Sequence, residues 1–216
     1  MKKLTFIMAA MLALVLGSCS SNKNEEPALP DQELKVGNTF NISLDGTDWQ
    51  SDNDKIASVK GKVVTANKVG EVKIRNGKQF FRVNVTPRYT YITDPYLIWG
   101  SSKATVKKSV KTPFVSETDT EIKFGPLGKE THTTYYFGAQ GLARLVIGIS
   151  PSKVSEADVL KFLNERYTQI GTGHSNGTGE QFLIFLAPAG HTDVQFIKYT
   201  SPNPLAGTFA IGYIKF

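Results

Sequence analysis

The sequence is poor in the residues that build disulfides and zinc sites. Its 216 residues include one cysteine, Cys19, so no disulfide can close within the chain. The three histidines, His132, His174 and His191, lie far apart and form neither an H-x-H pair nor a pair four residues apart. Because zinc sites are built mainly from cysteine and histidine, a zinc site would have to be assembled by the fold alone. We therefore expect no metal site.

The glycine-rich motifs of nucleotide-binding proteins are missing as well: neither a P-loop nor G-x-G-x-x-G occurs. Residues 173–177 (GHSNG) do match the G-x-S-x-G nucleophile elbow of α/β-hydrolases around Ser175. That motif needs a helix after the serine, whereas Thr178-Gly179 and a strand-like run follow it here. The pattern favours a mobile glycine-rich loop or hairpin over 171–179. We expect no catalytic residue and no cofactor-binding residue, and the scattered carboxylates single out no glycosidase pair.

Long apolar runs are also absent. The apolar stretch from Leu4 to Leu16 follows Met1-Lys2-Lys3 and is shorter than the roughly 20 residues that a membrane-spanning helix needs. A basic start, a short apolar region and small residues at a cleavage point are typical of a signal peptide. An ordinary secretory peptide or a buried apolar helix is the alternative interpretation.

The end of this stretch, Leu16-Gly17-Ser18-Cys19, resembles the lipobox of bacterial lipoproteins. In that family the cysteine thiol is acylated and the cysteine becomes the first residue after cleavage. The resemblance implies that residues 1–18 are removed and that the lipid on Cys19 anchors the protein to a membrane without a spanning helix. It places the protein in the cell envelope, with the outer membrane favoured and the periplasmic or surface-facing side left open.

Residues 19–32 contain two prolines and few apolar side chains, which predicts a flexible tether behind the anchor. Glu25 and Glu26 resemble either a weak signal for export to the cell surface or ordinary solvated charge. The formal charge of +6 falls to about +4 (6 − 2) when Lys2 and Lys3 leave with the signal peptide. An exported protein rarely meets nucleic acid, so this modest basicity suits a membrane or polyanionic glycans, and we expect no nucleic-acid partner.

Residues 33–86 alternate between apolar and polar side chains between turn signals. Phe40, Ile42 and Leu44 alternate with polar neighbours, and 72–74 and 81–85 behave in the same way. Breaks occur at Gly37-Asn38, Asp45-Gly46, Asp52-Asn53, Gly61, Gly70 and Asn76-Gly77. Short strands closed by such turns predict an antiparallel β-sandwich.

The same segment is similar to the bacterial Ig-like domain of group 2. The strings that carry the resemblance are 49–53 (WQSDN), 56–59 (IASV), 61–66 (GKVVTA) and 70–74 (GEVKI), preceded by Leu34 and Gly37. The resemblance implies a surface-protein module that serves as a spacer or a binding domain, without catalysis. We expect Trp49 in the core and a turn closed by Asp52-Asn53. A cation site at Asp48, Asp52 and Asp54 is the less favoured alternative.

Residues 88–216 predict an α+β domain with an antiparallel sheet and two helices. Strands are expected over 89–92, 121–124, 133–137, 142–149, 182–187, 194–199 and 209–216. One helix is expected over 101–111, ended by Pro113, and its lysines Lys103, Lys107, Lys108 and Lys111 form either a solvated face or a surface for anionic groups. A second helix is expected after Ser155, which forms a capping box with Asp158. This helix is expected to bury Leu160, Leu163 and Tyr167. The strings 96–106 and 162–167 look like uncharacterised secreted lipoprotein domains of no known activity.

Together these features predict a mostly β, non-enzymatic envelope lipoprotein. Its organisation is a signal peptide (1–18), a lipidated tether (19–32), an Ig-like β-sandwich (33–86) and an α+β domain (88–216). The sandwich would act as a spacer in surface binding or adhesion, and the α+β domain as a head for a protein or glycan ligand. A polysaccharide hydrolase is the alternative, as is a module that inhibits or senses another envelope protein.

Overall fold

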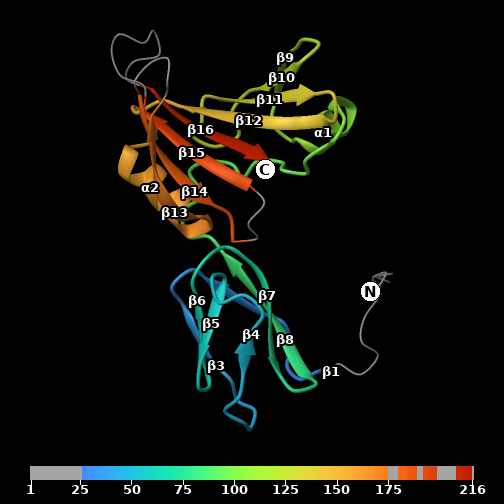
Figure 1. Ribbon diagram of the computed structural model, residues 1–216, viewed down its shortest axis with the longest axis vertical. Coiled ribbons are helices and arrows are strands. Elements are labelled where there is room, and N and C mark those ends of the chain that lie inside the picture. Colours follow the sequence, from blue (N-terminus) through green and yellow to red (C-terminus); the bar gives the residue numbers. More distant parts are fainter. Residues whose placement is uncertain (1–25, 175–179, 189–191, 199–207, 216) are drawn as a thin grey trace, which may run out of the picture.

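A computed structural model describes residues 26–174, 180–188, 192–198 and 208–215. The expected signal peptide and Cys19 lie outside these residues. Within them the chain is mostly β with two helices, and its buried apolar side chains form two separate clusters. Figure 1 shows the two corresponding lobes stacked along the long axis of the molecule. The expected class, a β-sandwich followed by an α+β domain, is confirmed.

The first lobe consists of two sheets packed face to face. The larger sheet contains β1 (Glu26–Pro27), β2 (Gln32–Lys35), β4 (Gln50–Ser51), β7 (Gly70–Asn76) and β8 (Gln79–Thr86). The smaller sheet contains β3 (Thr39–Asn41), β5 (Ala57–Lys60) and β6 (Val63–Ala66). Trp49 is buried between them, with its ring 5.7 Å from that of Phe81, as the sequence predicts.

The start of this lobe differs from the prediction in two ways. Strands β1 and β2 pair with β8 in parallel, so the sandwich is not purely antiparallel. Residues 26–32, expected to belong to the tether, lie on the sandwich instead. Ala28 donates its N–H to the carbonyl of Phe80, and both Ala28 and Leu29 pack against the core. A short segment with two apolar residues gains this order because the edge of β8 offers it backbone partners.

The second lobe contains one eight-stranded antiparallel sheet in the order β13-β14-β15-β16-β12-β11-β10-β9. Helix α1 (Lys103–Ser109) precedes the first four strands: β9 (Phe114–Glu117), β10 (Glu121–Phe124), β11 (His132–Gly138) and β12 (Gly141–Ile149). Helix α2 (Glu156–Arg166) precedes the last four: β13 (Thr168–His174), β14 (Gln181–Leu186), β15 (Thr192–Lys198) and β16 (Phe209–Lys215). The lobe thus repeats a helix followed by a four-stranded meander, and the two repeats join where β12 pairs with β16.

Both helices pack on the same face of this sheet. Val106 of α1 and Phe162 of α2 belong to one apolar cluster together with Tyr135, Leu145 and Tyr213 from the sheet. Those three sheet residues are direct neighbours across β11, β12 and β16, so their side chains share a face. The linker residues Tyr89 to Trp99 also contribute side chains to this cluster.

Four elements of this lobe differ from the prediction, and one of them is β9, which is not among the expected strands. Residues 89–92 form no strand, because the neighbours of this segment are side chains and a loop rather than a sheet edge. Residues 171–174, expected in a mobile loop, belong to β13 and pair with β14. Helix α1 ends at Ser109, two residues before the expected end at Lys111. The cap of α2 is as predicted, since Ser155 accepts the N–H of Asp158, although Leu160 is only partly buried.

Candidate functional site

The face of the eight-stranded sheet that points away from the helices is an open surface. Side chains alternate between the two faces of a strand, so the sequence neighbours of each core residue point to the opposite side. Three rows of side chains run across the strands on this side, in the order β11, β12, β16, β15 and β14. They are Thr134-Val146-Gly212-Gln195-Ile184, Tyr136-Arg144-Ile214 continued by Leu186, and His132-Gly148-Ala210-Ile197-Phe182. We call these residues the open face.

The open face is rich in apolar side chains that have no intramolecular core to join. Val146, Ile184, Leu186, Ile197 and Ile214 are only partly buried, and none of them belongs to either apolar cluster. At the centre, Gly212 has no side chain, and a Cβ built there would meet no atom within 4 Å. Gly212 and Thr134 of the central row are themselves buried, so a partner would contact the half-buried aliphatic side chains around them.

A small cavity of about 150 Å³ opens at one end of this face. His132, Val146, Gly148 and Ala210 line it. The ring of His132 lies over Gly148, where an added Cβ would come within 2.4 Å of the imidazole, so a glycine is required beneath the ring. Burial, and to a smaller extent the positive charge of Lys123, lowers the pKa of His132. The imidazole is therefore neutral at pH 7, and the cavity is mainly apolar.

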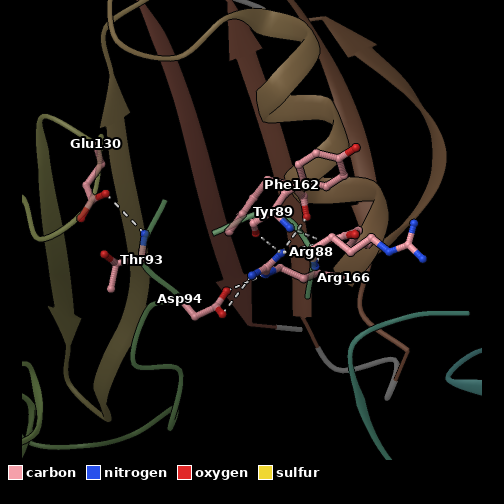
Figure 2. A network of polar contacts seen from close by, with 8 residues as sticks. Arg88, Tyr89, Thr93, Asp94, Glu130, Phe162 and Arg166 are labelled. Atoms are coloured by element: carbon pink, nitrogen blue, oxygen red, sulfur yellow. Dashed lines mark hydrogen bonds and ion pairs between the residues drawn. The ribbon is translucent and has the colours of Figure 1, made fainter. Parts of the chain in front are cut away.

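A second polar arrangement holds the linker between the two lobes. Glu165 and Arg166, at the end of α2, are only 6% and 4% exposed. The Glu165 carboxylate accepts the backbone N–H groups of Arg88 and Tyr89 at 2.9 Å each. Arg166 donates to the carboxylate of Asp94 at 2.6 and 3.1 Å and to the carbonyl of Tyr89 at 3.2 Å (Figure 2).

The same helix end binds the first lobe directly. The backbone carbonyl of Glu165 accepts the N–H of Val69 at 2.7 Å, and the ammonium of Lys68 donates to the carbonyl of Asn164. The Arg88 guanidinium in turn donates to Asn38 of the sandwich. We call Arg88, Tyr89, Asp94, Glu165 and Arg166 the junction. It connects both lobes to the end of one helix, which limits the orientations that they can adopt.

Glu130 fixes the next part of the linker. It is buried, and its carboxylate accepts the N–H groups of Leu127 and Gly128. It also accepts the N–H of Thr93 (Figure 2). Burial alone would raise the pKa of Glu130, but the backbone N–H groups of Gly128 and Leu127 outweigh it and hold the pKa below its usual value. Its charge is thus used to position backbone rather than for proton transfer at neutral pH.

The structure disperses most of the other residues that the sequence singles out. Asn53 closes its turn by accepting the N–H of Lys55, but Asp52 pairs with Arg75 instead of joining the turn. Within the described ranges no group of histidine, cysteine, aspartate or glutamate side chains could hold a metal ion. In the lysine-rich helix α1, Lys103 and Lys107 both pair with Glu117, which neutralises part of that face.

Only the first two residues of the motif 173–177 lie within the described structure. Gly173 and His174 belong to the edge strand β13, while Ser175 and His191 lie outside the described residues. Strand β14 follows where a nucleophile elbow would need a helix.

Sequence reasoning missed the two surfaces that the fold assembles. The open face becomes visible only when strands from both repeats are placed in register. The continuous apolar runs 182–186 and 145–147 were available as a signal, because such a run places apolar side chains on both faces of a strand. The buried pair Glu165-Arg166 gave no signal, because charged residues at the end of a helix are usually solvated.

In the part of the chain that the structure describes, no helix combines the length and the apolar character needed to cross a bilayer. Comparison with family models, with curated proteins and with solved structures found no match for this chain.

Proposed function

We propose that this protein is a non-catalytic, lipid-anchored cell-envelope protein that binds another protein through the open face. The observation that carries the proposal is that the helices cover only one face of the sheet. Both helices pack on that face, and the other face carries apolar side chains that belong to neither apolar cluster. In the proposal, the lipid on Cys19 tethers the molecule, and the sandwich, similar to a group 2 bacterial Ig-like domain, serves as the spacer.

The size of the open face supports a protein partner. The five strands of the open face, about 4.8 Å apart and each about 20 Å long, present an area of about 480 Å². A standard protein–protein interface buries roughly 800 Å² on each partner, and weak or transient complexes bury less than about 600 Å². The open face therefore matches a small interface of the transient kind.

The composition of the open face favours a protein over a glycan. Its centre carries aliphatic side chains and glycine, as the apolar core of a protein interface does. Sugar rings stack on exposed aromatic faces, but the ring of Tyr136 is already covered by the Arg144 guanidinium, 5.4 Å from the ring centroid. The ring of Phe182 lies over Gly173 of the neighbouring strand.

The junction supports the role of the sandwich as a spacer. A flexible connection would let the head take any orientation, whereas the hydrogen bonds of Glu165 and Arg166 tie the linker and both lobes to one helix end. A spacer with a restricted connection presents the open face at a defined distance and angle from the anchor.

The test places an arginine in the middle of the open face. Gly212→Arg is compatible with the backbone, because Gly212 has no positive φ and its Cβ would meet open space. Ala139→Arg, at the exposed β11–β12 turn, adds the same side chain elsewhere. The full chain in detergent, coupled to a photo-crosslinker, is incubated with native membranes, and captured proteins are identified by mass spectrometry.

We expect the wild type and Ala139→Arg to capture the same protein, and Gly212→Arg to capture at least about tenfold less while melting at a similar temperature. Equal capture by Gly212→Arg contradicts the assignment of the open face. Capture of glycan without protein contradicts the class of partner.

A further inference from the structure

A cavity of about 260 Å³ lies on the helix side of the sheet, away from the open face. It is bounded by the residues at and after the end of α1, by the linker segment 93–96, and by two core-facing residues of β11, Thr133 and Tyr135. The junction and Glu130 hold the linker side of this cavity through Asp94 and Thr93. The cavity therefore has walls of fixed shape.

The walls carry hydroxyl groups with unused hydrogen-bonding capacity. The Oγ1 atom of Thr112 is buried and has no hydrogen-bond partner among the described residues. Tyr135 accepts the N–H of Tyr96 with its phenolic oxygen, which leaves the Tyr135 proton free to be donated. Burial raises the pKa of Tyr135 to about 12, so that proton is present at every physiological pH. A buried hydroxyl without a partner is costly, and native proteins keep few of them without a reason.

Glu130, Asp94 and Lys111 carry the charges around the cavity. The Glu130 carboxylate lies behind Thr93 and Leu127 and is turned to their backbone N–H groups and to that of Gly128. The carboxylate of Asp94 is already paired with Arg166. Lys111 also lines the cavity, and it makes no ion pair with any residue that the structure describes. Hydroxyl donors together with one unpaired ammonium favour a ligand that carries both hydroxyl groups and a negative charge.

We propose that this cavity binds a sugar acid of the size of a monosaccharide, with its carboxylate at Lys111 and its hydroxyls at Thr112 and Tyr135. The volume lies just below the roughly 300–1,000 Å³ of pockets for drug-sized ligands, which fits one sugar ring and not an oligosaccharide. Pro95 and Val110 supply the apolar part of the lining. This site is independent of the open face, which lies on the other side of the sheet.

The test measures binding to the full chain in detergent by titration calorimetry. The probes are D-glucuronate and D-galacturonate, with D-glucose and D-galactose as neutral counterparts of the same ring size. We expect at least one uronate to bind with a Kd in the millimolar range or below, and its neutral counterpart to bind about tenfold more weakly, which corresponds to about 1.4 kcal/mol.

Three variants locate the binding. Lys111→Met should weaken uronate binding about tenfold and leave the neutral sugar unchanged. Thr112→Val removes the hydroxyl and keeps the shape, so it should weaken uronate binding about fivefold, as the loss of one neutral hydrogen bond does. The melting temperature of Thr112→Val should not fall, because the hydroxyl has no partner in the free protein. Gly212→Arg, on the open face, should bind the uronate as the wild type does.

The proposal is overturned if neither uronate binds at millimolar concentrations, or if the neutral sugars bind as tightly as the uronates. It is also overturned if Lys111→Met and Thr112→Val both bind the uronate with wild-type affinity.

Discussion

At the scale of the residue, Trp49 is the side chain on which the sandwich depends most clearly. It is 4% exposed, and its ring packs against Phe81, which itself contacts Phe40. Its indole N–H is buried without a partner in the described structure. We expect Trp49→Ala to lower the free energy of unfolding of the first lobe by about 3–5 kcal/mol, the range for large aromatic truncations in a core.

Urea denaturation followed by circular dichroism measures this loss. Trp49→Phe is the matched control, because it keeps an aromatic ring and removes the unpartnered N–H, so it should cost clearly less than the alanine variant. A transition that does not change in Trp49→Ala would show that the indole contributes nothing to the core.

Residues differ in how far the sequence predicts their roles. Trp49 and Ser155 were predictable, since Trp49 stands in the string 49–53 that resembles the Ig-like domain and Ser155 begins a capping box. Arg166 stands in no such pattern. Its burial depends on Asp94 and Tyr89, which are 72 and 77 residues away in the chain. Local patterns carry no information about such partners.

At the scale of the element, the last turn of α2 buries residues that the sequence did not lead us to expect in the interior. The helix was expected to bury Leu160, Leu163 and Tyr167, but its last turn also buries Glu165 and Arg166 because the linker lies against it. The linker has no neighbouring strand to accept its backbone N–H groups. The Glu165 carboxylate accepts those of Arg88 and Tyr89 instead.

We expect Glu165→Leu to destabilise this connection. The variant leaves the N–H groups of Arg88 and Tyr89 without an acceptor, and each unsatisfied buried donor costs about 1–3 kcal/mol. Hydrogen exchange of these two amides should accelerate, while amides in β12 and β16 keep their protection. Glu33→Leu, at an exposed position of β2, is the control for the same substitution. If the Arg88 and Tyr89 amides exchange at the same rate in Glu165→Leu, the carboxylate does not hold the linker.

The strands show the same division between local and distant causes. Strands β10, β11, β12, β14, β15 and β16 are short segments rich in apolar, aromatic and β-branched residues, and they were predicted within a residue or two. Strand β13 was missed because its two glycines are typical of a loop, and it exists because β14 offers a free edge with which it pairs. Strand β9 was missed because all four of its residues are exposed and show no periodicity.

At the scale of the whole molecule, the class of each lobe was predictable and the joining of the repeats was not. The sequence predicts a helix and strands twice over, but only the pairing of β12 with β16 merges two meanders into one sheet with a common open face. That pairing joins residues that are sixty to seventy positions apart, and no local signal specifies it.

If Cys19 carries a lipid, as proposed, the chain between Cys19 and β1 sets the distance of the sandwich from the membrane. Residues 28–29 pack on the sandwich core, so the connection to the anchor is shorter than the expected tether. The six residues 20–25 span at most about 21 Å when fully extended. An acylated Cys19 would therefore hold the sandwich close to the bilayer surface, with the second lobe beyond it.

Lipidation itself is the prediction on which this arrangement rests. We expect Cys19→Ala to abolish labelling by a clickable palmitate analogue and to leave the precursor uncleaved by the lipoprotein signal peptidase, because no other residue in the chain carries a thiol. Ser18→Ala keeps a small residue before the cysteine and should be labelled and cleaved as the wild type is. Mobility on a gel and in-gel fluorescence report both steps in one experiment. If Cys19→Ala incorporates the analogue normally, the lipid is carried elsewhere, and the sandwich has no reason to lie at the membrane surface.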